Sequence, residues 1–315
     1  MPGIRRGDLN RRRTFNRTFD RACIAFCDRA VRRCDYMGTL IQDARNDSFP
    51  RSTILGLWQQ FPIPMVSYYL AQMRWDCVIL DMQHGCLNLE TAYDCIHVIR
   101  AAGVQPWVRV SISSPNEVQK MLDLGALGII VPMVNSVKEA QELASAAKYP
   151  PLGSRSLGGD FRYTYGDRYP EEANAATKLL VQVEHIRSIE VVEELVAVEG
   201  VDGCFIGPTD LALSMGLPRS GFESDLKHRL AIQRTLDACA CFNKLSCCNC
   251  YSVDEAKEKA NQGFQCLTLQ SDADHFVAAV KKLLAELRAA TRSQPVAAFT
   301  RPTEMISELP SEKRS

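Results

Sequence analysis

Two carboxylates, Glu184 and Asp210, stand 26 residues apart, each just after an apolar run. Glu184 ends LLVQVE and Asp210 follows GCFIGPT, so each acid lies where a buried strand would open into a loop. In a partly dry pocket the two charges would repel each other, and a hard divalent cation removes that penalty. Two protein oxygens leave most of an octahedral shell open, which suits Mg²⁺, Mn²⁺ or Co²⁺ as a Lewis acid for a chelating 2-oxo acid. The pair therefore predicts a catalytic metal site, although each acid alone would also suit a strand-end cap or a surface ion pair.

Other polar side chains follow other apolar runs. His84 comes after CVILDM in a group with Asp81 and Gln83, and Arg109 ends WVR. Imidazole exchanges protons near neutral pH, so His84 is a candidate general base, although a histidine before a glycine is also common in ordinary loops. A guanidinium at the end of a core strand suits an oxyanion or an enolate better than a packing role.

The lysines argue against a Schiff-base mechanism. That chemistry needs a lysine that projects into the site, but Lys178 and Lys244 precede their apolar runs, and no lysine ends one. Enolate chemistry at a metal is the better match to these residue types.

The elements that must position these side chains alternate along the chain. Amphipathic stretches such as 114–126 and 136–149 separate most of the apolar runs, as in alternating β and α units with parallel strands. Eight such units in about 250 residues predict a (β/α)8 TIM barrel, whose reactive groups lie at the C-terminal ends of its strands. A doubly wound sheet is the alternative, but 54–62 lacks the G-x-G-x-x-G pattern of its first turn. The predicted strands are 54–58, 77–82, 107–111, 128–134, 179–183, 203–207, 245–250 and 266–270.

The composition of the chain limits the class of protein. Its 315 residues are 46% hydrophobic and 23% charged, which is enough for a large core. The 37 basic and 37 acidic side chains cancel, so no overall charge favours nucleic acid or a membrane surface. Polar residues interrupt every apolar run before the roughly 18 residues that a membrane helix needs. We therefore expect a soluble protein with a small-molecule partner, and neither nucleic acid nor membrane.

The 13 cysteines indicate reduced thiols. Several lie inside predicted strands, such as Cys77 and Cys266, which is typical of buried thiols in a cytosol-like compartment. In LSCCNC, Cys247, Cys248 and Cys250 suggest a metal site, but adjacent cysteines point to opposite faces of a strand. We favour a buried strand over a zinc site there.

The two ends of the chain differ from its middle. Residues 1–45 hold 11 arginines and five aspartates, with neither lysine nor glutamate. We expect an Arg-rich N-terminal extension over 1–45, the barrel over 46–290 and a flexible tail over 291–315. A mitochondrial presequence is the alternative for the extension, but its aspartates break the acid-poor composition of such segments. The expected location is therefore cytoplasmic.

Motifs between residues 48 and 290 resemble one protein family. They are DMQHGCLN, WVRV, KMLDLGALGIIVPMVNS, YPPLGSRSLGG, LLVQVE and GVDGCFIGPTDLALSMGL. In order and spacing they are similar to the HpcH/HpaI aldolases, the metal-dependent pyruvate aldolases related to 4-hydroxy-2-oxoheptanedioate aldolase. The resemblance implies a barrel of the phosphoenolpyruvate/pyruvate superfamily type that assembles as a homo-oligomer, commonly a hexamer, partly by exchange of a terminal helix.

The resemblance also implies which residues bind metal and substrate. Glu184 in QVE and Asp210 in GPTDL match the family's metal ligands, so the expected cofactor is a divalent cation, Mg²⁺, Mn²⁺ or Co²⁺. Gln182 and the Thr209–Asp210 backbone fall where the family holds pyruvate.

Three catalytic residues are implied in the same way. His84 matches the catalytic base, which takes the C4-hydroxyl proton through a water held by the metal. Asp123, in KMLDLGA, matches the acid that pairs with this histidine and makes it a stronger base, and Arg109 matches the stabiliser of the enolate. The expected reaction is reversible aldol cleavage of a 4-hydroxy-2-oxo acid to pyruvate and an aldehyde.

The sequence departs from the family in ways that leave alternatives open. Gln83 replaces the usual glutamate before the histidine, the loop around Arg155 reads GSRS, and the segment 160–178 is shortened. These changes affect the loops that would choose the aldehyde. A citryl- or malyl-CoA-type lyase is the nearest enzymatic alternative, but the strand ends lack the basic cluster that a coenzyme's phosphates need. A non-catalytic barrel that acts as a binding protein is the other alternative.

Overall fold

The structure is a computed structural model, and it describes residues 53–159, 162–163 and 166–291. The predicted extension over 1–45 lies outside the described residues, as does the predicted tail beyond Thr291. The two boundaries between the three predicted segments therefore stay predictions.

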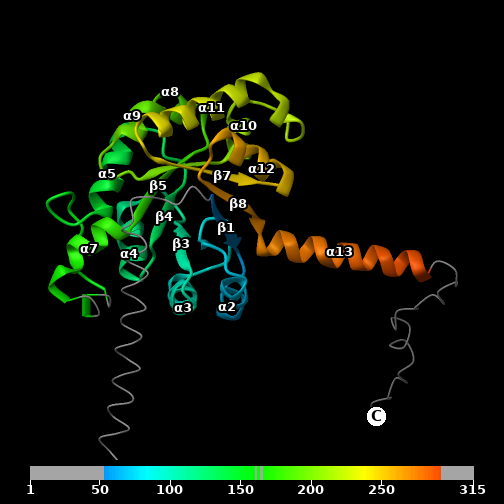
Figure 1. Cartoon of the computed structure of the whole chain (residues 1–315), viewed down its shortest axis with the longest axis horizontal. Coiled ribbons are helices and arrows are strands. Elements are labelled where there is room, and N and C mark those ends of the chain that lie inside the picture. The colour runs from blue at the N-terminus through cyan, green and yellow to red at the C-terminus, as the bar shows by residue number, and fades with distance from the viewer. Residues whose placement is uncertain (1–52, 160–161, 164–165, 292–315) are drawn as a thin grey trace, which may run out of the picture. The chain divides into compact units, whose positions relative to one another are not determined.

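Eight parallel strands close into a barrel in chain order, so the predicted (β/α)8 fold is confirmed (Figure 1). Every predicted strand corresponds to an observed one, and the apolar runs form the strands because both faces of a barrel strand are covered. The strands are β1 (Ile54–Gln59), β2 (Cys77–Asp81), β3 (Gln105–Arg109), β4 (Gly128–Val131), β5 (Lys178–Val183), β6 (Gly203–Ile206), β7 (Leu245–Cys250) and β8 (Cys266–Ser271).

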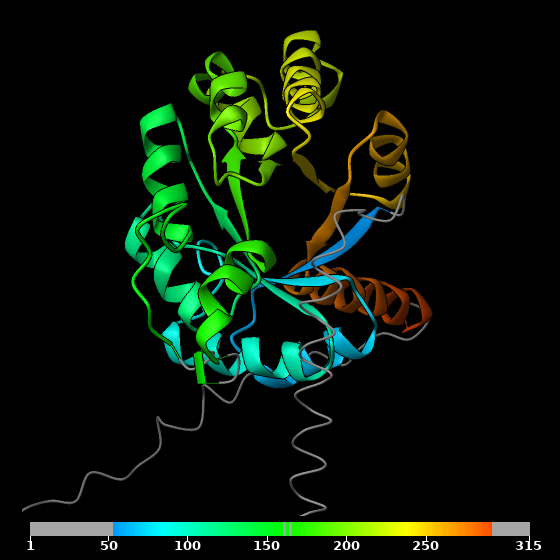
Figure 2. The ribbon, with the colours of Figure 1, turned by 60° about the vertical axis from the view of Figure 1, so that its left-hand side comes forward.

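Helices connect consecutive strands and surround the barrel (Figure 2). They are α2 (Pro64–Gln72), α3 (Leu89–Ala101), α4 (Pro115–Asp123), α5 (Val137–Ala147), α7 (Tyr169–Ala176), α8 (Ile186–Glu190), α9 (Val192–Ala197), α10 (Pro208–Ser214), α11 (Leu226–Cys241) and α12 (Val253–Gln262). A further helix, α13 (Asp272–Thr291), follows β8. The described part of these connections also contains two short 3₁₀ turns, η1 (Gly166–Arg168) and η2 (Phe222–Ser224).

Local sequence signals set where several helices begin. The Asn88 side chain accepts from the backbone N–H of Thr91 at 2.9 Å, and the Thr91 hydroxyl accepts from the backbone N–H of Asn88, which forms a capping box for α3. Ser136 and Ser252 cap α5 and α12 through their hydroxyls. These caps follow the ends of β2, β4 and β7 within seven residues, so each fixes the far end of a loop that begins at a strand end.

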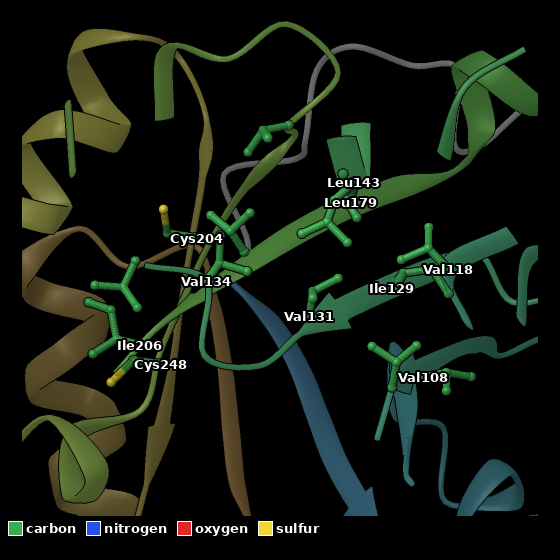
Figure 3. Packing of buried hydrophobic residues seen from close by; sticks show 14 of the residues in the cluster. Val108, Val118, Ile129, Val131, Val134, Leu143, Leu179, Cys204, Ile206 and Cys248 are labelled. Atoms are coloured by element: carbon green, nitrogen blue, oxygen red, sulfur yellow. The ribbon is translucent and has the colours of Figure 1, made fainter. Parts of the chain in front are cut away.

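The core has an inner and an outer layer because successive side chains of a strand point to opposite faces. In β7, Cys247 packs inside the barrel with Trp107 and Phe205, whereas Cys248 packs outside. Figure 3 shows Cys248 in the outer layer with Ile206 and Val134. The prediction that LSCCNC forms a buried strand is confirmed.

The chain divides into two compact units, one that ends at Ala273 and one that begins at Asp274. The first unit contains the barrel. In the second, α13 carries an apolar stripe of exposed side chains, Val280, Leu283, Leu284 and Leu287, at helical spacing. None of the described helices is both long enough and apolar enough to cross a membrane.

Replacing Gly128 by alanine is expected to destabilise the barrel by about 1–3 kcal/mol through overpacking. A Cβ at Gly128 would lie 2.5 Å from the Trp107 ring, which is itself buried inside the barrel. Urea unfolding of the purified variant measures the change. Gly158→Ala is the matched control, because its nearest neighbour, Asp123 Oδ2, would lie at 3.4 Å. Equal stability of the two variants would contradict this packing.

Candidate active site

Glu184 stands at the C-terminal end of β5 with both carboxylate oxygens held. Met133 donates its backbone N–H to Oε1 at 2.7 Å, and Gln182 donates its Nε2–H to Oε2 at 2.5 Å. The Glu184 residue is 2% exposed. Two donors and tight burial fix the orientation of this carboxylate before any ligand binds.

Backbone features of two neighbouring loops make this arrangement possible. Met133, after β4, has a φ of 56°, a left-handed conformation that a non-glycine residue rarely adopts. Met133 is also the residue whose backbone N–H donates to Glu184 Oε1. Gly207, after β6, leaves a space that a Cβ would fill, because it would lie 2.8 Å from Glu184 Oε2 and 3.1 Å from Gln182 Nε2.

Asp210 lies in the first turn of α10 and is close enough to act on Glu184 electrostatically. Burial raises the pKa of Glu184 above its ordinary value, and the charge of Asp210 acts in the same direction. The Met133 N–H, the charge of Arg109 and the Gln182 amide oppose this rise. The pair therefore has the electrostatic conflict that the sequence predicted.

A divalent cation fits the donor set of this site. Ionised Glu184 and Asp210 are hard oxygen donors, and the buried Oε1 of Gln182 has no hydrogen-bond partner among the described residues. The same part of the chain contains no group of three or more His, Cys, Asp or Glu side chains that could enclose a metal ion. Two carboxylates match the predicted open site, which leaves positions for substrate and water.

Arg109 ends β3 and forms a two-pronged ion pair with Asp81 at the end of β2. Its Nε and Nη2 donate to Asp81 Oδ1 and Oδ2 at 2.9 and 2.8 Å. The guanidinium carbon also lies 4.5 Å from the centre of the Trp58 ring, in a cation–π contact. These contacts hold the guanidinium at the mouth of the barrel and within electrostatic range of Glu184.

The buried carboxylate of Asp81 stays ionised largely because Arg109 lies beside it. Burial by itself would raise the pKa of Asp81, but the hydrogen bond and charge of Arg109, with hydrogen bonds from Gln60 and the His84 backbone, lower it below its ordinary value. Ionised Asp81 in turn accepts the backbone N–H groups of Gln83 and His84, both at 3.2 Å. The carboxylate thus orients the turn that carries His84, whose own side chain is exposed.

Replacing Asp81 by asparagine is expected to cost about 3–5 kcal/mol at neutral pH, because Arg109 is left buried and unpaired. A depressed folded pKa contributes stability that is present above the ordinary value of 3.8 and lost as pH falls through the folded value. The difference from wild type should therefore shrink below about pH 4. Chemical unfolding across pH measures it, with exposed Asp254→Asn as control. A pH-independent difference would contradict the account.

Two contacts hold the start of α10. The Tyr251 hydroxyl, after β7, is hydrogen-bonded to the hydroxyl of Thr209. His228, buried in the first turn of α11, contacts the Pro208 carbonyl oxygen through Nε2 at 2.9 Å. Both contacts lie within two residues of Asp210, so they help to fix where its carboxylate stands.

Asp123 lies away from this group. It ends α4, and a helix of the barrel runs antiparallel to its strands, so the end of α4 lies at the N-terminal ends of the strands. The Asp123 carboxylate accepts from Arg155 Nη2 at 2.7 Å. Within one chain the structure therefore does not bring Asp123 to His84. The other predicted site residues gather at the opposite end, where strands β2, β3, β5 and β6 end.

The family model for HpcH/HpaI aldolase/citrate lyase matches residues 55–279. The chain belongs to this family. Aldolases and citrate lyases both break carbon–carbon bonds, so it is a family of carbon–carbon lyases. The match spans the barrel, and the predicted resemblance is confirmed.

Relatives within the HpcH/HpaI family have names that describe aldolases. The chain is 34% identical over 233 residues to a hydroxypyruvate/pyruvate aldolase of Rhizorhabdus wittichii, covering 74% of this chain and 93% of the relative. It is 32% identical to a 2-keto-3-deoxy-L-rhamnonate aldolase of Salmonella typhi, covering 60% and 70%. A crystal structure of a family member from Burkholderia cenocepacia superposes with a TM-score of 0.71 at 27% identity, covering 79% of this chain and 99% of that one.

Sequence reasoning about this HpcH/HpaI chain missed four features of the site. The positive φ of Met133 and the close approach at Gly207 depend on tertiary contacts that no local pattern indicates. Tyr251 and His228 could have been found, because Tyr251 directly follows a predicted strand and His228 is a polar residue on the buried face of a helix.

Proposed function

We propose that the protein is a metal-dependent pyruvate aldolase that reversibly cleaves a 4-hydroxy-2-oxo acid to pyruvate and an aldehyde. The observation that carries the proposal is the Glu184 carboxylate, fixed by two N–H donors beside Asp210 and within electrostatic range of Arg109. Family membership and the names of the relatives support carbon–carbon cleavage that yields a 2-oxo acid.

Glu184 and Asp210 would hold a divalent cation, Mg²⁺, Mn²⁺ or Co²⁺. When bound, the cation supplies Lewis-acid polarisation of the 2-oxo group. The Gln182 amide, with its unsatisfied oxygen directed away from Glu184, and the Thr209–Asp210 segment orient the 2-oxo acid beside it.

The remaining side chains move a proton and stabilise charge. His84 takes the proton of the C4 hydroxyl as the C3–C4 bond breaks, so that the aldehyde forms and the bonding electrons pass to the enolate of pyruvate. Arg109 donates to the developing enolate oxygen from a guanidinium that Asp81 and Trp58 hold in place. Return of a proton to C3 completes pyruvate, and aldol addition is the reverse path.

Purified protein should release pyruvate from 4-hydroxy-2-oxo acids only when a divalent cation is present. The assay follows pyruvate after EDTA treatment and again after addition of Mg²⁺, Mn²⁺ or Co²⁺. Release that stops with chelation and returns with the cation supports the proposal. A protein that binds the cation and cleaves none of these acids, but cleaves citryl- or malyl-CoA, would replace it with the lyase alternative.

The position of Asp123 supports a homo-oligomer in which two copies complete one site. Because Asp123 and His84 of one chain lie at opposite ends of the barrel, an Asp123–His84 pair needs Asp123 from a second copy. The apolar stripe of α13 supports association as well, since exposed apolar helix faces are costly in water. A hexamer is the proposed assembly.

Mixing two inactive variants is expected to restore activity if the pair forms between copies. Oligomers assembled from equal amounts of H84A and D123N chains contain some sites with both native residues, and about a quarter of wild-type activity should return for random pairing. Each variant alone, denatured and refolded in the same way, is the control. Activity that stays at the level of the single variants would contradict a shared site.

A further inference from the structure

Arg155 has no role in the mechanism above, although it is the ion-pair partner of Asp123. It lies on the loop that follows α5, and because barrel helices run antiparallel to the strands, α4 and α5 end on the same side of the barrel. The Arg155 side chain is 1% exposed, whereas the Asp123 side chain is 26% exposed. The cation of the pair is therefore inside the protein and the carboxylate is at its surface.

Close packing fixes the position of the Arg155 side chain. Its guanidinium carbon lies 4.5 Å from the centre of the buried Tyr149 ring. The backbone N–H of Arg155 donates to the Lys148 carbonyl oxygen at 3.0 Å. A Cβ at Gly153 would lie 2.3 Å from the same oxygen, so the loop packs against the end of α5 only with glycine there. The guanidinium thus reaches Asp123 from a fixed direction.

This ion pair is poorly arranged for stability. Burial removes water from the guanidinium, and an ion pair offsets that loss only when the remaining polar atoms are also paired. Arg155 Nε is buried and has no hydrogen-bond partner among the described residues. Water around the partly exposed Asp123 also weakens the attraction between the two charges. The arrangement suits the orientation of the carboxylate better than the stability of the fold.

Only one of the two carboxylate oxygens of Asp123 is held by Arg155. Nη2 donates to Oδ1 at 2.7 Å, and in the described part of the chain no donor meets Oδ2. The loop passes close by with glycines: a Cβ at Gly159, whose φ is 78°, would lie 2.7 Å from the Asp123 carbonyl oxygen. A Cβ at Gly158 would lie 3.4 Å from Oδ2, so glycine there leaves this oxygen uncovered.

We propose that Arg155 is a positioning residue that holds Asp123 of its own chain with Oδ2 turned outward, to meet His84 of a second copy. The inference rests on the proposed function and on its site shared between copies. Arg155 touches neither substrate nor His84. Its effect on the reaction passes through Asp123 alone, because a base is effective only when the group that orients it is itself held in place.

Replacing Arg155 by glutamine is expected to lower kcat for pyruvate release about 10–100-fold, because Asp123 loses the contact that orients it. KM for the 2-oxo acid should change less, since a buried Arg155 does not contact the substrate. Arg155→Lys keeps the buried charge without the planar fork, so its kcat should lie between the two. Arg234→Gln, which breaks the exposed pair with Glu193, is the matched control and should keep wild-type kinetics.

Mixed oligomers separate positioning from a purely structural role. With R155Q and H84A chains, some sites take His84 from the first chain and an intact Arg155–Asp123 pair from the second, so about a quarter of wild-type activity should return. With R155Q and D123N chains, no chain carries both Arg155 and Asp123, so activity should not exceed that of R155Q alone. The same two mixtures made with R155K repeat the test in a chain that keeps the buried cation.

Three results would overturn this proposal alone. Wild-type kcat in R155Q would show that Asp123 needs no help from Arg155. Activity that returns with D123N chains but not with H84A chains would place Arg155 in the site of its own chain. No return in either mixture, for R155Q and R155K alike, would make Arg155 a residue of folding or assembly only.

Two reference measurements tell this failure from a failure of the proposed function. Wild-type protein that releases no pyruvate from any 4-hydroxy-2-oxo acid fails the proposed function itself. An active wild type whose H84A and D123N chains do not restore activity when mixed fails the shared site, and the role of Arg155 with it.

Discussion

Replacing Glu184 by glutamine is expected to abolish cation-dependent activity, with a loss of turnover of at least about a thousandfold. Glutamine keeps the size of the side chain and can still meet the Met133 N–H, but it removes the negative charge that a cation requires. Wild-type protein should gain thermal stability when Mn²⁺ is added, because a ligand that binds only the folded state stabilises it. In Glu184→Gln that gain should disappear together with pyruvate release.

A second prediction for Glu184→Gln concerns the stability of the metal-free protein. A carboxyl group whose folded pKa is raised weakens the fold as pH rises above its ordinary value, because the buried charged form is disfavoured. Metal-free Glu184→Gln should therefore be at least as stable as wild type at neutral pH, and the difference should vanish at pH values below 4.5, the ordinary value. Glu142→Gln, an exposed surface change, is the control. A metal-free variant that is much less stable would contradict this view of the site.

Replacing Arg109 by lysine is expected to lower kcat by about a hundredfold to a thousandfold. Lysine keeps the positive charge but cannot donate to both oxygens of Asp81 while it stacks on Trp58 and faces an enolate. KM for the 2-oxo acid should change less, because the interaction with the enolate strengthens only as the bond breaks. Steady-state kinetics of pyruvate release separate the two parameters.

Arg234→Lys is the matched control for this prediction. Arg234 also forms a two-pronged pair, with Glu193, but both side chains are exposed on the outside of the barrel. It should keep wild-type kinetics. A folded Arg109→Lys protein that retained kcat within about threefold would remove the guanidinium from charge stabilisation.

The fold was predictable because each of its strands is an apolar run that is visible in the sequence. A barrel strand is covered on both faces, so runs such as CVILD and GIIV stand out against the amphipathic helices between them. Residues at strand ends were predictable for the same reason. Glu184 and Arg109 are charged residues at the ends of otherwise apolar strands, and the barrel topology gathers such ends in one place.

The partners of the site residues were less predictable, because they come from distant parts of the chain. The pair of Arg109 with Asp81 joins two strand ends, and the donor to Glu184 is a backbone N–H whose position depends on the backbone conformation of Met133. Asp123 shows a different limit. A motif match gives a residue its role, but the end of the barrel at which it stands follows from the direction of its helix.

The mouth residues on β7 were the hardest to assign from sequence. In LSCCNCYS the cysteines draw attention as metal ligands, whereas Asn249 and Tyr251 have side chains that suit a loop or a strand equally well. Their contacts with Trp58 and Thr209 exist only because the barrel closes β7 against β8 and β6. Closure is a long-range property that a local pattern does not carry.

The central claim, that this barrel mouth generates a pyruvate enolate with the help of a divalent cation, is tested most directly by proton exchange. Pyruvate is incubated with the protein in D₂O, without aldehyde, and deuterium in its methyl group is followed by mass spectrometry. We expect exchange with Mg²⁺, Mn²⁺ or Co²⁺, none after EDTA, and none in Glu184→Gln. Folded wild-type protein that binds the cation and pyruvate yet leaves the methyl protons in place would contradict the claim.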